Sequence, residues 1–159
     1  MKLVFFMILF SGCSFFTGIK ESPKTAKGSR YSISFNESEW VQKNDQRSDF
    51  IFENKRDGRI LLSNSFCDEF QGSSLEQIGL KTFSGIKEFK IILSKYDSFH
   101  ERESFRLDAS GLMDGVRVTF KLLNTRRDNC YFDFLSINPE GTKILINDFE
   151  NFLNSVIFK

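Results

Sequence analysis

The stretch FRLDASGLMDGVRVTFKLLNTRRDNCYFDFLSI, residues 105–137, decides the fold of this chain. Two of its runs alternate apolar and polar residues, as strands with one buried face do, and a third strand-like run follows. The predicted strands are residues 105–109, 116–122 and 130–137, and the predicted turns are residues 113–115 and 125–129. Consecutive strands joined by short turns predict an antiparallel meander.

The residues upstream of the meander also favour strands. Asp57-Gly58 lies between two strand-like runs and is a strong hairpin signal. Residues 36–47 are predicted as a polar connection around Trp40. The strands predicted in this part are residues 31–35, 49–54, 59–66 and 87–96.

Two helices complete the expected architecture. Ser73 and Glu76 form a Ser-x-x-Glu capping box at the start of a predicted helix over residues 73–85. Residues 144–156 place their apolar side chains on one side and predict a closing helix. The predicted fold class is therefore α+β, with an antiparallel sheet of about six to seven strands packed by two helices.

The first thirteen residues, MKLVFFMILFSGC, are typical of a secretory signal peptide. Lys2 is the positive start, Leu3 begins an unbroken apolar run, and small residues follow it. The run is far shorter than the roughly 20 residues that a membrane-spanning helix needs. The expected organisation is a signal peptide over 1–12, a flexible tether over 13–30 and a single domain over 31–159.

Phe10-Ser11-Gly12-Cys13 resembles the lipobox of bacterial lipoproteins, although Phe10 stands where Leu is usual. The resemblance implies cleavage before Cys13, a diacylglycerol on its thiol and an acyl chain such as palmitate on its new amine. Several acyl chains give a stable membrane anchor. The expected location is the cell envelope, facing the periplasm or the surface. Ser14 follows the cysteine in place of Asp, which favours the outer membrane over the inner one. The alternative is an ordinary signal peptide cut nearby.

The order of elements over residues 31–159 resembles the PsbP-like domains, an α-β-α sandwich. The features that carry the resemblance are the opening run at 31–35, the hairpin formed by 49–52 and 59–66, the capped helix, the Asp114-Gly115 turn and the closing Phe149-x-x-Phe152 helix. Members of the family bind or assemble partner complexes as a rule and do not catalyse, so the resemblance implies a contact function. No functional residue of the family is matched in this chain.

Cys67 and Cys130 remain as an even pair once Cys13 is assigned to the lipid. In an oxidising compartment such a pair predicts a disulfide. Two separate buried thiols are the alternative, because free cysteine often behaves as a small apolar residue.

No pattern in the sequence predicts a catalytic, cofactor or metal site. His100 is the sole histidine and lacks a recognisable nucleophile, so a surface position is expected. Arg126-Arg127 could bind a phosphate or a partner carboxylate, but a solvated turn is expected. Four aspartates near the meander could cluster for hydrolysis or calcium binding, but structural roles are expected for Asp108, Asp114, Asp128 and Asp133.

The expected function is that of a non-catalytic, membrane-anchored interaction module with an unidentified envelope protein as its partner. A net charge of +1 gives no basic field for nucleic acid. The first alternative is a protein that binds a small apolar ligand between sheet and helix, and a cavity lined by some of the 20 Phe residues would favour it. An envelope hydrolase is a further alternative, which convergent buried acids in a cleft would favour.

Overall fold

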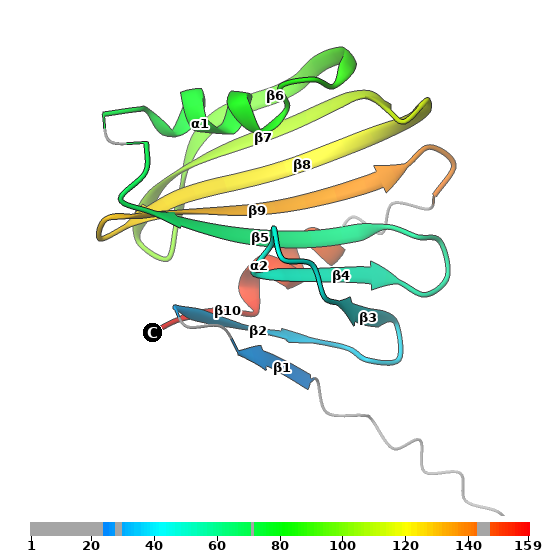
Figure 1. Ribbon diagram of the computed structural model, residues 1–159, viewed down its shortest axis with the longest axis horizontal. Coiled ribbons are helices and arrows are strands. Elements are labelled where there is room, and N and C mark those ends of the chain that lie inside the picture. Colours follow the sequence, from blue (N-terminus) through cyan, green and yellow to red (C-terminus); the bar gives the residue numbers. More distant parts are fainter. Residues whose placement is uncertain (1–23, 28–29, 71, 143–146) are drawn as a thin grey trace, which may run out of the picture.

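A computed structural model describes residues 24–27, 30–70, 72–142 and 147–159. They form two antiparallel sheets and two helices (Figure 1). The small sheet has the order β1 (Lys24–Lys27), β2 (Tyr31–Phe35) and β10 (Val156–Phe158). The seven-stranded sheet has the order β3 (Trp40–Lys43), β4 (Phe50–Asn54), β5 (Ile60–Cys67), β9 (Cys130–Pro139), β8 (Val116–Arg127), β7 (Arg102–Met113) and β6 (Lys87–Phe99). The helices are α1 (Leu75–Thr82) and α2 (Asp148–Asn154).

The α+β class and the meander of β7, β8 and β9 are confirmed. The helices have only 8 and 7 residues, so the two sheets dominate the architecture. Strand β9 is the middle strand of the large sheet, and it is buried on both faces. Tyr131 and Leu135 contribute to a core with α1, whereas Phe132 and Phe134 contribute to a second core with α2 and the small sheet. This alternation follows from the period-2 geometry of a strand.

Helix α1 lies close against β7 and β8. A Cβ atom on Gly79 would come within 3.0 Å of the amide nitrogen of Asn124, so glycine permits this approach. The Asn124 amide also donates to the carbonyl of Leu75 at 2.7 Å. The capping box uses Ser74 and Gln77, one residue later than the sequence predicted, because Ser73 uses its carbonyl to hold the preceding loop.

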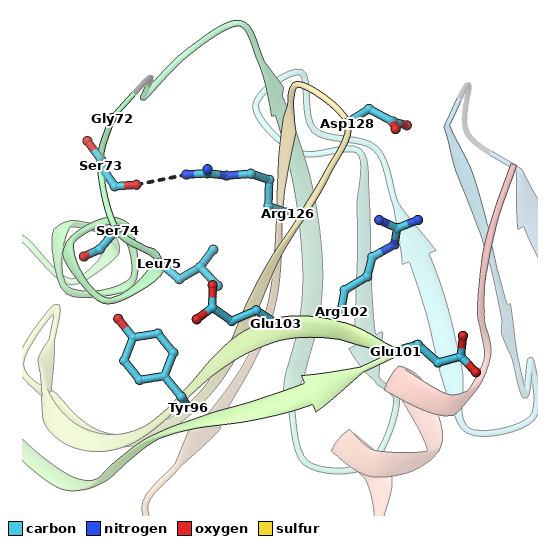
Figure 2. Close-up of a pocket in the computed structure, with 10 residues that line it drawn as sticks. All are labelled: Gly72, Ser73, Ser74, Leu75, Tyr96, Glu101, Arg102, Glu103, Arg126 and Asp128. Atoms are coloured by element: carbon cyan, nitrogen blue, oxygen red, sulfur yellow. Dashed lines mark hydrogen bonds between the residues drawn. The ribbon is translucent and has the colours of Figure 1, made fainter.

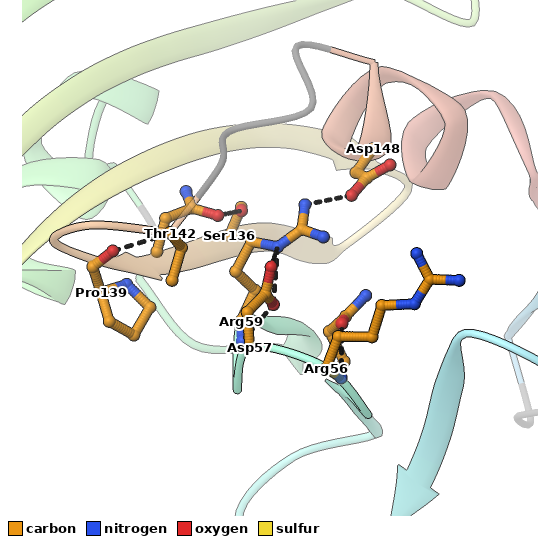
Figure 3. A network of polar contacts seen from close by, with 9 residues as sticks. Arg56, Asp57, Arg59, Ser136, Pro139, Thr142 and Asp148 are labelled. Carbon is orange, nitrogen blue, oxygen red and sulfur yellow. Dashed lines mark hydrogen bonds and ion pairs between the residues drawn. The ribbon is translucent and has the colours of Figure 1, made fainter.

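Helix α2 is fixed by an aromatic core and by one buried cation. Phe149, Phe152 and Leu153 pack among the Phe residues of the second core. Arg59, whose side chain is only 5% exposed, pairs with Asp57 at 2.8 Å and also with Asp148 at the start of α2 (Figure 3). The turn between β4 and β5 is therefore tied to the helix by a shielded ion pair, which screening by salt weakens less than an exposed one.

Several element boundaries differ from those the sequence predicted. Residues 24–27, expected in the flexible tether, form β1 and pair with β2. The closing helix is limited to Asp148–Asn154 among the described residues, and Val156 begins β10. The expected polar connection over residues 36–47 contains β3, because Trp40 is buried and its strand pairs with β4.

Strand β6 runs further than predicted and turns directly into β7. His100 and Glu101 both have positive φ, at 49° and 62°, and they link the paired residues Phe99 and Arg102. A two-residue loop with both φ values positive is a type I′ turn, whose twist matches that of the strands on either side. No Asn-Gly or Asp-Gly pair stands at this place in the sequence, so no local signal predicts the turn.

Candidate functional site

The outer edge of the large sheet carries the most exposed apolar residues of a single element. Strand β6 is the last strand of the sheet, and it pairs with β7 alone among the described strands. Its exposed fractions are 50% for Ile91, 65% for Ile92, 46% for Leu93 and 50% for Tyr96. Apolar side chains gathered on one free edge mark an interaction site or an aggregation hazard.

Neither helix covers this edge. Helix α1 packs on β7 and β8, and α2 packs toward β2 and the second core. Figure 1 shows β6 as the outermost strand of the large sheet, next to β7 and close to α1. We name the exposed strand Lys87–Phe99 the β6 edge.

The hydrogen-bonding groups of the β6 edge alternate in direction. The carbonyl of Glu103, the residue opposite Ser98, accepts from Thr125 on β8, so it points away from β6. The N–H of Ser98 donates instead to its neighbour's carboxylate, Asp97 Oδ1, at 2.8 Å. Ser98 therefore directs its backbone groups outward, and the period of two gives Ser94 and Tyr96 the same direction.

Only part of the β6 edge is regular. Pairing with β7 shifts register between Lys87 and Lys90 and again between Ile91 and Leu93. From Leu93 to Phe99 the pairing continues without interruption. Bulges and edge lysines are devices that limit non-specific strand pairing, so the regular part is the segment open to an additional strand.

An open cleft of about 720 Å³ adjoins this edge at Tyr96. It lies between the start of α1, the β6–β7 turn and the β8–β9 turn (Figure 2). Tyr96 and Glu103 face the start of the helix, whereas Glu101 and Asp128 point away from it. The cleft therefore has one aromatic wall and a mixed set of charges around its rim.

Arg126 and Tyr131 shape the other wall of this cleft. The Arg126 guanidinium lies over the Tyr131 ring at 4.4 Å and donates to the carbonyl of Ser73 at 3.0 Å. The Tyr131 hydroxyl donates to the same carbonyl at 3.1 Å and to that of Phe70 at 3.2 Å. These contacts use the arginine to hold the loop that precedes α1.

A second pocket of about 220 Å³ lies between α2 and the sheets. Its apolar walls include Phe35, Trp40, Phe52 and Phe152, and Asp148 lines its polar side. It is the cavity partly lined by phenylalanine that the apolar-ligand alternative required. Its volume is below the roughly 300 Å³ at which sites for drug-sized ligands begin.

The residues considered for hydrolysis do not converge. Asp114 lies in the β7–β8 turn and Asp128 in the β8–β9 turn, at opposite ends of the 12-residue β8. Asp108 is on β7, paired with Leu93 and Lys121. His100 lies in the β6–β7 turn with its ring against those of Phe99 and Phe158 at 4.5 and 5.6 Å.

Arg126 and Arg127 are not together in a turn, because β8 continues to Arg127. Successive strand residues point to opposite faces. Arg126 accordingly packs on Tyr131, and Arg127 lies 5.4 Å from the centre of the Phe158 ring. Among the described residues, no group of three or more His, Cys, Asp or Glu side chains is placed to hold a metal ion.

Asp133 is the one aspartate of the four that is buried, at 4% exposure. Burial raises the pKa of its carboxyl from 3.8 to about 7, and a hydrogen bond from Thr82 partly opposes the rise. Asp133 lies opposite Asn64 on one side and Asn124 on the other, in a polar row that crosses three strands. Asp133 is buried beneath α1 and has no neighbouring carboxylate in the row, so its role is structural.

Cys67 and Cys130 are joined by a disulfide between the paired strands β5 and β9. The Arg30 guanidinium donates to the Cys130 sulfur at 3.0 Å. Cys13 and the proposed signal peptide lie outside the described residues. Within the described part of the chain, no helix is long and apolar enough to cross a membrane.

The sequence predicts a strand at residues 87–96, but it does not predict that this strand lies at the edge of the sheet. The available signal was the run Ile91-Ile92-Leu93, which breaks the alternation expected of a strand with one buried face. Three adjacent apolar residues in a strand fit burial on both faces or exposure at a contact surface. Pairing order decides between the two.

No family model and no curated protein matches this sequence. Solved structures do match its fold. Cyanobacterial PsbP (CyanoP) of Synechocystis has a TM-score of 0.63 at 11% identity, over 89% of this chain and 96% of that one. LpqN of Mycobacterium tuberculosis, described as involved in cell envelope biogenesis, has a TM-score of 0.59 at 9% identity, over 90% and 87% of the two chains.

A protein from Bacteroides thetaiotaomicron has a TM-score of 0.57 at 15% identity. The match covers 81% of this chain and 45% of that longer one. Identities this low establish the fold alone. The domain therefore has a fold similar to that of PsbP, which its order of elements resembled, but its two sheets dominate and it is not a clear α-β-α sandwich.

Proposed function

We propose that this chain is a lipoprotein of the bacterial cell envelope, anchored through Cys13, whose domain works without catalysis by binding a protein strand along the β6 edge. The observation that carries the contact function is the exposure of Ile91, Ile92 and Leu93 on a strand with a free edge. An added strand would satisfy the outward backbone groups and bury these side chains together.

The anchor and the contact surface support each other physically. Ten residues separate Cys13 from the start of β1 at Lys24, and they reach at most roughly 35 Å when extended. Confinement near a membrane raises the effective concentration of partners held in the same layer. A short strand contact that is weak in free solution would then be sufficient. The envelope role described for LpqN is compatible with this location.

Site-specific photo-crosslinking in intact cells tests the contact surface. A crosslinking residue at Ile92, which is 65% exposed, should capture a discrete protein species. The matched control is Ile157, which is 62% exposed but lies on the small sheet. Equal crosslinking from both positions, or none from Ile92, would overturn the assignment of the β6 edge.

The anchor has a separate test in Cys13→Ala. We expect the variant to lose fatty-acid labelling and to leave the membrane fraction, because the thiol that carries the lipid is gone. The lipoprotein assignment would be overturned if the variant stayed in the membrane fraction and the wild-type protein incorporated no fatty-acid label.

The apolar-ligand alternative is favoured only by the 220 Å³ pocket beside α2. Trp40 lines this pocket and is the only tryptophan, so its fluorescence reports on occupancy. Titration with short apolar compounds should change the Trp40 spectrum if the pocket binds them. Leu61→Phe, which adds no second tryptophan, would narrow the pocket and should then reduce the response.

A further inference from the structure

The regular part of the β6 edge is complementary to itself. We propose that its occupant is a second copy of this chain, with Leu93–Phe99 of the two copies paired antiparallel and Tyr96 opposite Tyr96. This inference rests on the contact surface proposed above and names its partner. The pairing would join the two seven-stranded sheets edge to edge.

Symmetry restricts the registers that two identical antiparallel strands can use. The two-fold axis must stand perpendicular to the sheet, so each face of one copy continues into the same face of the other. Directly opposed residues share a face, so their numbers must differ by an even amount. The register therefore has one residue opposite itself at the axis.

Charge selects Tyr96 as that residue. With Tyr96 on the axis, Lys95 of each copy lies opposite Asp97 of the other, which gives two attractive pairs. A shift of the axis to Lys95 places two lysines together, and a shift to Asp97 places two carboxylates together. Like charges directly opposed are destabilising, so the neighbouring registers are disfavoured.

The backbone groups meet in the same register. Ser94, Tyr96 and Ser98 direct their N–H and C=O groups outward, and the register sets Ser94 opposite Ser98 and Tyr96 opposite Tyr96. These become the hydrogen-bonded pairs of the new ladder. Within one copy Asp97 accepts the Ser98 N–H and pairs with Lys95 at 3.3 Å and with Arg106 at 3.1 Å. The first two contacts would be exchanged for those across the axis.

The ends of the regular segment limit the contact. The register shift before Leu93 closes one end, and the turn at His100 and Glu101 closes the other. Seven residues a side make a small interface, which fits an association that depends on confinement in one membrane layer. The bulges also keep the pairing from spreading into open aggregation.

Cysteine pairs test the register directly in membranes of cells that express two full-length chains. One chain carries Ser94→Cys with a size tag, and the other carries Ser98→Cys. Mild oxidation should give mixed disulfide dimers at least fivefold above either homodimer. The reason is that Ser94 lies directly opposite Ser98 of the other chain but roughly 13 Å along the strand from Ser94 of the other chain. The control is Val116→Cys, 52% exposed at the start of β8 and far from the β6–β7 turn, which should give no mixed dimer with Ser98→Cys.

Charge exchange provides the second measurement. Lys95→Glu in both cysteine chains should lower the mixed-dimer yield at least fivefold, and so should Asp97→Lys in both. Lys95→Glu in one chain and Asp97→Lys in the other should restore the yield, because only that mixture has opposite charges across the axis. If Lys95 and Asp97 acted only within one chain, this mixture would not restore the mixed-dimer yield, since neither chain regains its own ion pair.

Failure of this inference differs from failure of the proposed function. Homodimers equal to mixed dimers, or no dimers at all, would overturn the self-pairing. Capture of a different protein from Ile92 in that case would leave the β6 edge as a contact surface. Loss of specific capture from Ile92 would overturn the contact surface itself.

Discussion

Replacing Asp133 by Asn should remove most of a pH dependence from the stability of this domain. The Asp133 carboxyl lies beneath α1 at 4% exposure, and its Oδ1 atom has no hydrogen-bond partner among the described residues. Its hydrogen bond from Thr82 is long, at 3.4 Å. Burial therefore raises the pKa of Asp133 from 3.8 to about 7.

The sign of the effect follows from the proton bound by each state. Between pH 4 and pH 7 the unfolded chain ionises Asp133 while the folded chain keeps its proton, so stability falls as pH rises. The displacement of about 3 pKa units corresponds to roughly 4 kcal/mol, since each unit is worth about 1.4 kcal/mol. Above pH 8 both states are ionised, and the loss is complete.

Urea unfolding of wild type and Asp133→Asn at pH 4, 5.5, 7 and 8.5 measures this directly. The stability of the variant relative to wild type should rise by about 4 kcal/mol between the lowest and highest pH. Asp114→Asn, in an exposed turn that Asn also tolerates at positive φ, controls for exchange of a carboxylate for an amide. A difference between wild type and Asp133→Asn that does not change with pH would refute the reasoning.

Other perturbations act on the disulfide, one turn and one helix. Cys67→Ala with Cys130→Ala should lower the free energy of unfolding by about 4 kcal/mol, because the bridge closes a separation of 63 residues; equal urea midpoints with and without it would contradict this. Glu101→Gly should raise stability by about 1 kcal/mol, since φ is 62° there; thermal melts check it, and a lower Tm would be the contrary result. Gly79→Ala should destabilise the domain by about 1–3 kcal/mol in urea unfolding, because the added Cβ meets Asn124 and Leu122 at 3.0 and 3.2 Å. This loss should outweigh the higher helix propensity of Ala, and an increase in stability would exclude the contact.

The β6 edge combines an aggregation hazard with features of the same strand that limit it. An exposed edge with Ile91, Ile92 and Leu93 favours aggregation of a freely diffusing protein. The lysines at 87, 90 and 95 and the two register shifts oppose it. The two register shifts also leave only the segment Leu93–Phe99 available for regular pairing, so the same irregularities limit aggregation and restrict where a strand can pair.

The sequence by itself determined the strands and turns that are marked by neighbouring residues, such as β8 and the turn before it. The alternation over residues 116–122 marks one buried face of β8, and Asp114-Gly115 forms the turn between β7 and β8 because both residues tolerate positive φ. The α+β class follows from these periods. The even pair Cys67 and Cys130 predicted a bridge, which the structure contains.

Close alternatives in the sequence were decided by packing. Ser73 and Ser74 are both good caps, and the second is used because the carbonyl of Ser73 is held by Arg126 and Tyr131. His100 and Glu101 form a hairpin turn without the Asn-Gly or Asp-Gly pair that usually favours one, because the strands on both sides pair up to Phe99 and Arg102. Long-range pairing overrides a weak local preference in each case.

Only the tertiary structure decided which strand lies at the edge. The sequence predicts strands, but it does not say that β5 pairs with β9 across the chain and leaves β6 last in the order. The exposure of Ile92 and the outward backbone groups at Ser94, Tyr96 and Ser98 depend on that order. A strand's own residues record how its two faces are buried, whereas its neighbours are set by contacts between distant segments, and the candidate site is a property of those neighbours.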